Sequence, residues 1–581
     1  MILKTGELAD DNLSGFSGIG NFRGRRASEL SSDERTILEY FFTNVDSNVY
    51  VAKDTLPVEL WAMGMGQYAR SNITLKERFL QLLRDMPKKD PSAKTLEEIA
   101  TAIRSGTDAS DLMTSHLKKA GEFIVNWGID YGHASLRDSA SVRICFEGVS
   151  QRATKFLETA REGAYQEQST RATPFSIENL GTPFEVRRTP FEDRFQELGK
   201  KLISLYEEAK EKVITWMEKE YIDLRTDADE QIRKLSGNTN ARISDKSWEK
   251  VIREKAFDVS RSLLPQNITT SLGMTLCARR FQDMLTEWQS SEFAEMRMLG
   301  KAAQAEASKI FPYLMRYGER SEFMEQIPER TRVLSSQLGK YELPRNYGHY
   351  PIESKIIAFT PDIEDWVLAS ILLSVEKGRT LTELKEFVSK LSTEERARIA
   401  RSQFEGKNPY EVNIKTTEIG SLTFSRLYDI GAYRDLHRQR GDRQQISPYG
   451  TYLGYHMPKE ISLTGQGLPE KFEKLLEEIK RLHDDLKSEG MHSAAQYAPV
   501  MANLIHHVTT MDPNQLFYQA QLRCQPAGAD SYRTIALQEI RQGLKILPAF
   551  RGLISFDNKN SYLLNRLPEA IKTESKKYFE K

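Results

Sequence analysis

The stretch from Thr159 to Arg171, TAREGAYQEQSTR, combines arginines, amides and small hydroxyl side chains. A second stretch of the same type, HRQRGDRQQIS, places Arg440 at a distance of 279 positions from Arg161. Arginine forks bind oxyanions in a bidentate manner, and amides can pair with the donors and acceptors on a pyrimidine edge. We therefore expect two copies of one nucleotide-handling domain, each with an incomplete set of residues.

The alignment of these stretches extends into the residues before them. It places Lys155 opposite Arg434, and it also pairs Ala153 with Ala432 and Leu157 with Leu436. A dense run of charges is usually a solvated face. The recurrence of Arg at the same position after the same strand-like run favours a binding role.

Three further segments carry residue types suited to anions. The segment from Gly132 to Asp138 places His133, Ser135 and Asp138 at the start of a strand, where they are expected to hold a phosphate-bearing cofactor. The alternative is a turn whose histidine caps a carbonyl group. Arg261, Arg279 and Arg523 stand in the other segments. No HExxH, CxxC, Walker or GxGxxG pattern occurs, so we expect no catalytic metal.

Length and composition bound the class of protein. A chain of 581 residues predicts two to four domains. The 82 basic and 82 acidic residues balance, which argues against a general polyanion binder. The first residues contain no apolar core of signal-peptide length, and no apolar run is long enough for a membrane span, so a cytoplasmic location is expected. The three cysteines are expected to be buried and inert.

Hydrophobic periodicity divides the chain. It predicts a flexible arm at 1–35, a first domain at 36–325, a linker at 326–350 and a second domain at 351–581. Long amphipathic helices are predicted at 190–221 and from about Ala278 through Ser308. A strand is predicted at Val412–Phe424, before the second arginine stretch.

These residues together resemble the flavin-dependent thymidylate synthase family. Its signature is Arg-His-Arg, two residues, Ser, one residue, Asn-Glu, one residue, Ser, one residue, Arg-Tyr. The first copy keeps Arg161, Glu167, Ser169 and Arg171, with Gln166 in place of Asn, and it lacks the leading Arg-His and the final Tyr. The second copy keeps Arg438 and Arg440 with Gln439 in the His position, and it lacks the Glu and the Ser-x-Arg end.

The resemblance implies an α/β (α+β) fold in two tandem copies, each with a central mixed sheet and long flanking helices. It implies reductive methylation of deoxyuridylate (dUMP) to dTMP with FAD, NADPH and methylenetetrahydrofolate. The cofactors would carry the hard chemistry, and the protein would position the reactants and stabilise charge. The roles that follow are catalytic for Arg261 and Arg523; substrate-binding for Gln166, Glu167, Ser169, Arg171 and Arg438; and cofactor-binding for Ser71, His133, Ser135, Asp138, Arg161, Arg279, Gln439 and Arg440.

Each copy lacks residues that the other keeps, which indicates that the two complement one another. A homodimer of this chain would then imitate the family's tetramer, with fewer competent sites. Two alternatives stay open: a related flavin- and folate-dependent uracil-nucleotide hydroxymethylase, and a degenerate non-catalytic nucleotide- or flavin-binding protein.

Overall fold

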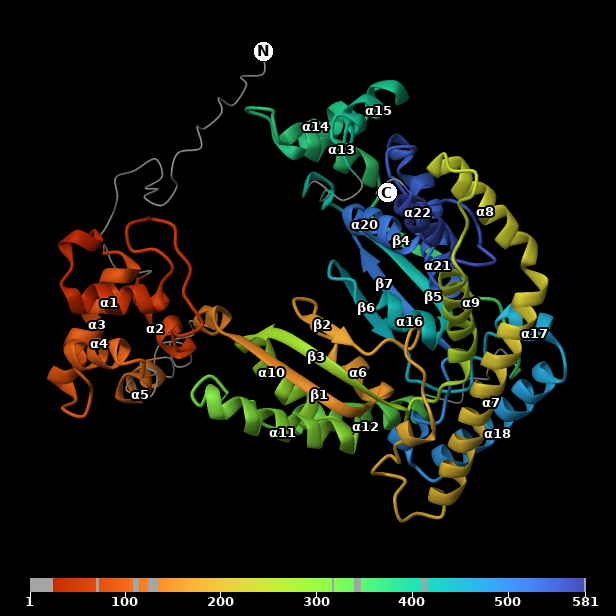
Figure 1. Ribbon diagram of the computed structural model, residues 1–581, viewed down its shortest axis with the longest axis horizontal. Helices are drawn as coiled ribbons and strands as arrows, with labels where there is room; N and C mark the ends of the chain where they lie inside the picture. The colour runs from red at the N-terminus through yellow and green to blue at the C-terminus, as the bar shows by residue number, and fades with distance from the viewer. Residues whose placement is uncertain are drawn as a thin grey trace.

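The computed structural model describes residues 25–68, 73–107, 114–123, 134–315, 318–338, 346–408, 411 and 415–578. Ser71 and His133 lie outside this part of the chain, and so does the side chain of Ser135. The described strands form two sheets, which lie at the centre of the molecule between groups of helices (Figure 1).

The first group of helices stands apart from both sheets (Figure 1). It has its own core, built around Ile37, Phe41 and Leu80. α1 begins at Ser32, inside the segment expected to be a flexible arm, because Ser31 caps it and closes a capping box with Glu34. The group comprises η2 (Ala27–Glu29), α1 (Ser32–Phe41), α2 (Val58–Tyr68), α3 (Leu75–Lys89), α4 (Leu96–Arg104) and α5 (Thr114–Phe123).

The first sheet has the order β1-β3-β2, and both of its pairings are antiparallel. α10 packs on β1 and β3, while three helices between β2 and β3 run along one side of the molecule (Figure 1). The elements are η5 (Ala134–Ser139), β1 (Ser141–Ser150), α6 (Gln151–Leu157), β2 (Ala164–Glu167), η6 (Ile177–Asn179), α7 (Glu192–Glu220), α8 (Ile222–Ser236), α9 (Asp245–Ser260), η7 (Arg261–Leu263), β3 (Thr269–Cys277), α10 (Ala278–Gln289), α11 (Ala294–Ile310) and α12 (Glu322–Gln337).

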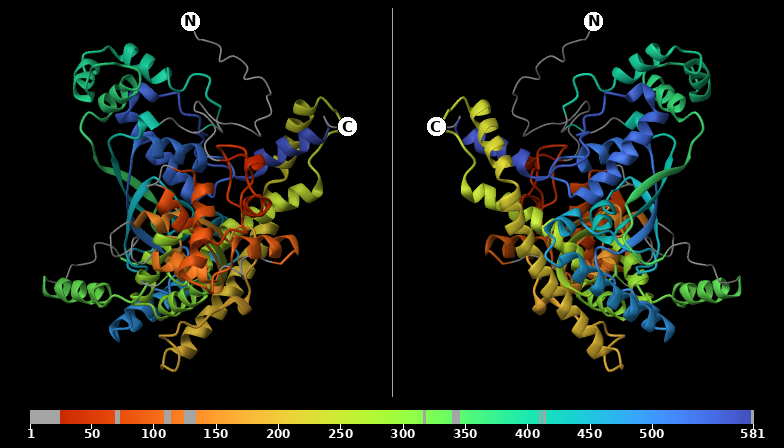
Figure 2. Two further views of the ribbon diagram at one scale, coloured as in Figure 1. Left: turned by 90° about the vertical axis from the view of Figure 1, so that its left-hand side faces the viewer. Right: turned by 90° about the vertical axis from the view of Figure 1, so that its right-hand side faces the viewer.

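Two expectations for this half need correction. The predicted helix through Ser308 is broken into α10 and α11, because Ser290 and Ser291 end the first helix; serine side chains compete for backbone hydrogen bonds and favour helix ends. The segment expected to be a linker begins inside α12, which projects from the body of the molecule (Figure 2).

The second sheet has the order β4-β5-β7-β6, again entirely antiparallel, so the expectation of mixed sheets is wrong. The strand predicted at Val412–Phe424 is wrong over most of its length: residues 412–414 lie outside the described part of the chain, Lys415–Thr417 form η8, and β5 begins only at Leu422 and continues to Asp429. The elements are β4 (Glu353–Phe359), α13 (Ile363–Leu373), α14 (Leu381–Val388), α15 (Thr393–Arg401), η8 (Lys415–Thr417), β5 (Leu422–Asp429), α16 (Ile430–Leu436), β6 (Asp442–Ile446), α17 (Lys459–Thr464), α18 (Leu468–Ser488), α19 (His492–Ala495), β7 (Leu504–Met511), α20 (Pro513–Arg523), α21 (Asp530–Ile546), η9 (Pro548–Phe550) and α22 (Leu567–Lys577).

The three strands of the first sheet share their connectivity with three strands of the second sheet, β5, β6 and β7. In each case a strand leads through a seven-residue helix to a second strand, and a third strand pairs between those two before a helix follows. Glu167 pairs with Leu272 in the first sheet and Ile446 with His507 in the second. Positions in β2 and β6 therefore differ by 279 (446 less 167), and positions in β3 and β7 differ by 235 (507 less 272).

The two halves meet where counterpart segments pair. Pro265 forms a bridge with Val500, which is 235 positions later. The N–H of Met501 donates to the carbonyl of Leu264 at 3.0 Å, next to that bridge. Because counterparts face each other in antiparallel fashion, this junction has local two-fold character.

Helices α7 and α18 are in contact with each other across the same junction. Three ion pairs recur at seven-residue intervals along both helices, from Arg194 with Asp485 through Lys201 with Glu478 to Glu208 with Lys471. The buried core of the first half accordingly includes α18 residues such as Leu476 and Ile479. The halves thus share one core at the junction.

Within the described residues, no helix is both long and apolar enough to span a membrane. Of the three cysteines only Cys524 is buried; Cys145 is exposed and Cys277 half-buried, so the expectation that all three are buried is wrong. Alternation along β1 turns Cys145 outward, whereas Cys524 follows α20 inside the core.

Candidate functional site

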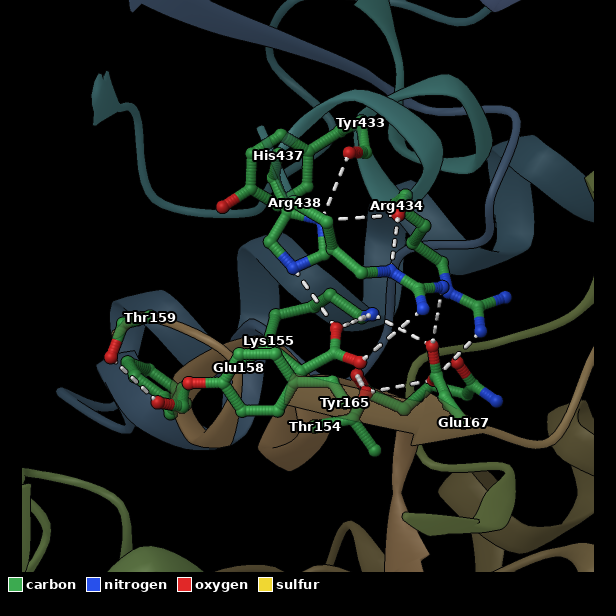
Figure 3. Close-up of polar contacts among 12 residues, drawn as sticks. Thr154, Lys155, Glu158, Thr159, Tyr165, Glu167, Tyr433, Arg434, His437 and Arg438 are labelled. Carbon is green, nitrogen blue, oxygen red and sulfur yellow. Dashed lines mark hydrogen bonds and ion pairs between the residues drawn. The ribbon is translucent and has the colours of Figure 1, made fainter. Parts of the chain in front are cut away.

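A buried ionic cluster lies at the junction of the two halves (Figure 3). The first half contributes Lys155, Glu158 and Glu167 from α6, the turn after it and β2. The second half contributes side chains from α16 and the turn that follows it, namely Arg434, His437 and Arg438. Both arginine-rich stretches of the sequence therefore converge on one place.

Glu167 is the centre of this cluster. Its side chain is 1% exposed and accepts from the Arg434 guanidinium at 2.8 Å and from the Lys155 ammonium at 3.0 Å. The Thr154 hydroxyl donates to it at 3.0 Å. Burial alone would raise the pKa of Glu167, but Arg434 and Lys155 outweigh burial and lower it, so the carboxylate is charged.

Glu158 and His437 form the other side of the cluster. The His437 Nε2 atom lies 3.0 Å from a Glu158 carboxylate oxygen, and its Nδ1 atom lies 3.1 Å from the carbonyl of Arg434. Burial and the nearby Lys155 lower the pKa of His437 to about 4. The ring is therefore neutral at pH 7 and can donate to the carboxylate or to the backbone, but not to both at once.

Two short helices position these side chains. The Ser150 hydroxyl caps α6 by accepting from the N–H of Ala153 at 2.9 Å. The Asp429 carboxylate caps α16 by accepting from the N–H of Ala432 at 2.8 Å. The caps are 279 positions apart, as are the helices, so each half presents the same face of a seven-residue helix to the junction.

A second ionic group adjoins the cluster and contains the other predicted arginines. Arg171 donates two parallel hydrogen bonds to the Asp258 carboxylate, one of them 2.7 Å long. Arg261 reaches Asp435 of α16 at 3.1 Å. Burial would raise the pKa of Asp435, but Arg261, Arg171 and Arg523 together lower it well below its usual range.

The junction carries a surplus of positive charge. Six cations face four carboxylates, and His437 is neutral at pH 7. Two of the cations are loosely held. Arg438 lies 3.5 Å from Glu167 and 3.9 Å from Glu158 with its side chain 31% exposed. Arg523 lies over the ring of Tyr532 at 5.5 Å, and its Nε atom has no hydrogen-bond partner.

The remaining predicted substrate residues lie at the edge of this region. Gln166 and Ser169 are exposed. The Ser169 hydroxyl accepts from the backbone N–H of Arg171 at 3.2 Å and so shapes the turn that carries this arginine.

The predicted cofactor residues are mostly engaged with protein partners. Asp138 and Arg279 pair with each other at 2.8 Å. Arg161 donates to the carbonyls of His437 and Gln439 across the junction. Two more residues complete the described set: the Gln439 side chain accepts from Gln515 at 2.8 Å, and Arg440 is exposed and lies 3.5 Å from the carbonyl of Gly163.

The structure also brings in residues that sequence reasoning did not assign. Asp258 and Asp435 supply the counterions for the arginines, and Glu158 with His437 completes the cluster. Glu158 and His437 are 279 positions apart, so the alignment of Arg161 with Arg440 already contained the signal for this pair. No sequence pattern indicates a role for Asp258, which lies on α9.

A cavity of about 670 Å³ lies beside Arg261 and Asp258. Gly431 opens one wall, since a Cβ atom there would stand 2.9 Å from an Asp429 carboxylate oxygen. Polar side chains of both halves line the cavity, among them Lys255, Ser262, His349, His456 and Asp530. Its volume suits a small-molecule ligand.

Comparison with known proteins shows a family match in the first half of the chain. Residues 81–313 match the protein family described as thymidylate synthase complementing protein. The resemblance inferred from the signature residues is therefore confirmed for this part of the chain. The match runs from α3 past the end of α11, so it contains the first sheet.

Relatives extend over nearly the whole chain. A UPF0159 protein of Chlamydia muridarum is 25% identical over 95% of this chain and 99% of its own length. A UPF0159 protein of Chlamydia pneumoniae is also 25% identical, over 94% of this chain and 99% of its own length. A solved UMP/dUMP methylase, PolB from Streptomyces cacaoi bound with 5-Br dUMP, is 13% identical over 37% of this chain and 100% of its own, with a TM-score of 0.29, which is too low to bear on the site.

Proposed function

We propose that this protein is a flavin-dependent thymidylate synthase-like enzyme that methylates dUMP to dTMP, with one composite nucleotide site built by two tandem copies of the fold. The match of residues 81–313 supports the reaction class. The observation that carries the proposal is the surplus of positive charge at the junction, where Arg438 and Arg523 of the second half lie beside Arg171 of the first.

Tandem duplication is supported by two features of the fold. The strand order β1-β3-β2 recurs as β5-β7-β6, and the registers of the two sheets differ by constant offsets. The residues that meet at the junction come from both copies, as complementation requires.

The chain's own residues would act by binding and by electrostatic stabilisation. A nucleotide phosphate is a dianion, and it would neutralise the two loosely held guanidinium groups of Arg438 and Arg523. Arginine beside the uracil oxygens would stabilise negative charge as C5 of the base becomes nucleophilic. Asp435 would hold the Arg261 fork in a fixed orientation for that role.

The predicted cofactor residues of one chain mostly contact protein partners. Asp138 pairs with Arg279, and Arg161 and Gln439 are hydrogen-bonded within the chain, while Asp138, Arg279 and Arg440 are exposed. Flavin binding in our proposal takes place between two chains, and the FAD with NADPH would supply the reducing equivalents when bound.

Calorimetric titration with dUMP tests the composite site. Arg438→Ala removes a loosely paired cation, and Arg171→Lys keeps a charge opposite Asp258 while it removes the fork. Each should weaken dUMP binding on the order of 10- to 100-fold, from about 1.4 kcal/mol per decade. The double variant should lose less than the sum of the two, because both act on one ligand.

Arg481→Ala is the matched control, since this arginine is exposed on α18 with its side chain 71% accessible. Full-strength dUMP binding by the Arg438→Ala protein would end the shared-site proposal. Incubation of the wild type with dUMP, methylenetetrahydrofolate, FAD and NADPH then separates the alternatives. The mass of the product distinguishes a methyl group from a hydroxymethyl group. If no NADPH is consumed, the non-catalytic binding protein is the alternative that is supported.

A further inference from the structure

Helix α12 turns an apolar stripe away from the rest of the molecule. None of its residues is buried, and the helix projects from the body (Figure 2). The stripe consists of Phe323, Ile327, Leu334 and the C-cap residue Leu338, whose exposed fractions are 66%, 44%, 54% and 70%. Spacings of four, seven and four residues lie close to whole turns of a helix, so these side chains share one narrow face.

The opposite side of α12 is the one that contacts the body. Arg332 reaches Glu292, in the turn after α10, at 2.9 Å. At the start of the helix, the N–H of Ser321 donates to the Ser290 hydroxyl at 2.8 Å. A surface helix normally packs its apolar stripe on the core and leaves its polar side to water. Here that arrangement is reversed, so the stripe is available to another molecule.

The stripe is self-complementary. Its midpoint falls between positions 330 and 331. Phe323 lies as far before this point as Leu338 lies after it, and the same holds for Ile327 and Leu334. Two copies of α12 placed antiparallel about a two-fold axis at the midpoint would therefore set each apolar side chain against an apolar side chain of the partner. A symmetric interface between identical chains needs a patch of this kind.

A charged side chain beside the stripe also favours the antiparallel arrangement. Arg330 lies next to the midpoint and donates to the side chain of Gln326, one turn closer to the N-terminus of the helix. In an antiparallel pair the two guanidinium groups would point in opposite directions and separate. In a parallel pair they would lie side by side, where like charges repel.

The position of α12 in the chain separates this surface from the family's fold. The family match ends at residue 313, before α12 begins at Glu322. The resemblance to the family therefore does not supply this contact. Four side chains from each copy are also few beside the roughly 20–30 residues a side of a standard interface, so a pair of α12 helices should be weak and reversible.

We propose that α12 is a self-association surface, through which two chains pair as antiparallel helices with their apolar stripes in contact. The second copy is the occupant because the stripe is complementary to itself in shape and orientation. This inference names a contact for the homodimer of the proposed function, and it depends on no step of the reaction.

Sedimentation velocity of the intact chain over a range of concentrations tests the surface. Leu334→Glu places a charge in the apolar contact twice in each dimer, so it should raise the dimer dissociation constant by at least 10-fold. Val333→Glu is the matched control, because Val333 is 47% exposed on the same helix but lies outside the stripe. This control should dimerise like the wild type. Circular dichroism should show both variants folded, since both positions are exposed.

Disulfide formation tests the antiparallel register. The variant carries Ile327→Cys and Leu334→Cys together, in a background where Cys145→Ser removes the exposed native thiol. Within one chain the two positions lie about 10 Å apart along the helix. A disulfide reaches no more than about 7 Å between Cα atoms. Mild oxidation should therefore link two chains, whereas the Ile327→Cys variant without the second cysteine should stay unlinked.

The inference is overturned if Leu334→Glu dimerises like the wild type, if the two-cysteine variant stays unlinked, or if Ile327→Cys alone links two chains. In the first case the dimer forms through another surface, and the homodimer itself stands. A wild type that is monomeric at every concentration would overturn both. Loss of dUMP binding in an intact dimer would instead remove the proposed function and leave this contact in place.

Discussion

At the scale of residues, the junction shows how buried charges can be kept for a ligand. A buried carboxylate opposite an arginine stabilises little in net terms, but the loss of one partner is costly. Asp258 is the direct hydrogen-bond partner of Arg171. Asp435 instead interacts with the charges of three arginines, Arg261, Arg171 and Arg523. The arginines are held in place without all being neutralised, as an anion site requires.

Asp435→Asn should expose this arrangement. The change removes a counterion from three arginines, so it should lower the free energy of unfolding by roughly 3 kcal/mol. Added dUMP should raise the melting temperature more in the variant than in the wild type, because the phosphate replaces the lost negative charge. Thermal unfolding with and without dUMP measures both effects.

The control for this experiment is Asp283→Asn, which removes an exposed carboxylate on α10 that lies 3.9 Å from Arg280. It should change the free energy of unfolding by no more than a few tenths of a kcal/mol, and it should leave the dUMP-induced shift in melting temperature unchanged. A smaller dUMP-induced shift in Asp435→Asn than in the wild type would show that this carboxylate binds the nucleotide itself and does not act as a counterion.

At the scale of elements, the short helices α6 and α16 position the charged side chains, and the long helices α7 and α18 hold the two halves together. The seven-residue helices α6 and α16 depend on their caps, because so few residues cannot sustain a helix alone. The pair α7 and α18 buries apolar side chains such as Leu202 and Ile479 across the junction. Its exposed ion pairs add little to stability and chiefly fix the antiparallel register.

A buried carboxylate joins the N-terminal helices to the rest. Glu59 of α2 is 2% exposed and accepts from the backbone N–H of Tyr313 at 3.2 Å. Burial raises the pKa of Glu59 from 4.5 to about 7, against the opposing effect of that hydrogen bond. The folded state therefore keeps this proton to a higher pH than the unfolded state does.

Stability should consequently fall as the pH rises from 4.5 to 7, and remain level above that range as far as Glu59 is concerned. Glu59→Gln removes the ionisation, so the variant should be more stable than the wild type at pH 8 by about 1–3 kcal/mol, and similar to it at pH 4.5. Urea unfolding at both pH values measures this difference.

Glu97→Gln, at an exposed position of α4, serves as the control and should show no such pH dependence. An equal or lower stability of Glu59→Gln at pH 8 would mean that the folded state does not raise the pKa of Glu59. Its hydrogen bond to Tyr313 would then outweigh the cost of burial.

At the scale of the whole molecule, one chain already contains a junction with local two-fold character. The two halves contribute different side chains to this junction, as Arg434 faces Glu167 and His437 faces Glu158, so the chain is asymmetric where a symmetric oligomer would repeat one site. In our proposal, flavin binds at a contact between two chains.

We predict a homodimer with a mass about twice 66.6 kDa, in which FAD is bound without a covalent link. Size-exclusion chromatography with light scattering and flavin absorbance should show the flavin in the dimer and not in the monomer. Dilution below the dimer dissociation constant should release it. A monomer with FAD at full occupancy would contradict this prediction.

The sequence by itself determined the class of the protein and most of its elements. The signature residues from Arg161 to Arg171 indicated the resemblance that the match of residues 81–313 bears out, and hydrophobic periodicity located helices such as α7 and α18, because both depend on residues close together in the chain. The offset of 279 between Arg161 and Arg440 also anticipated that β2 and β6 hold equivalent places in their sheets.

Only the tertiary structure decided which charges meet. Asp258 and Asp435 lie 177 positions apart and become the counterions of one arginine group because α9 and α16 pack at the same junction. The antiparallel pairing of both sheets also came from long-range contacts, to which local periodicity is blind.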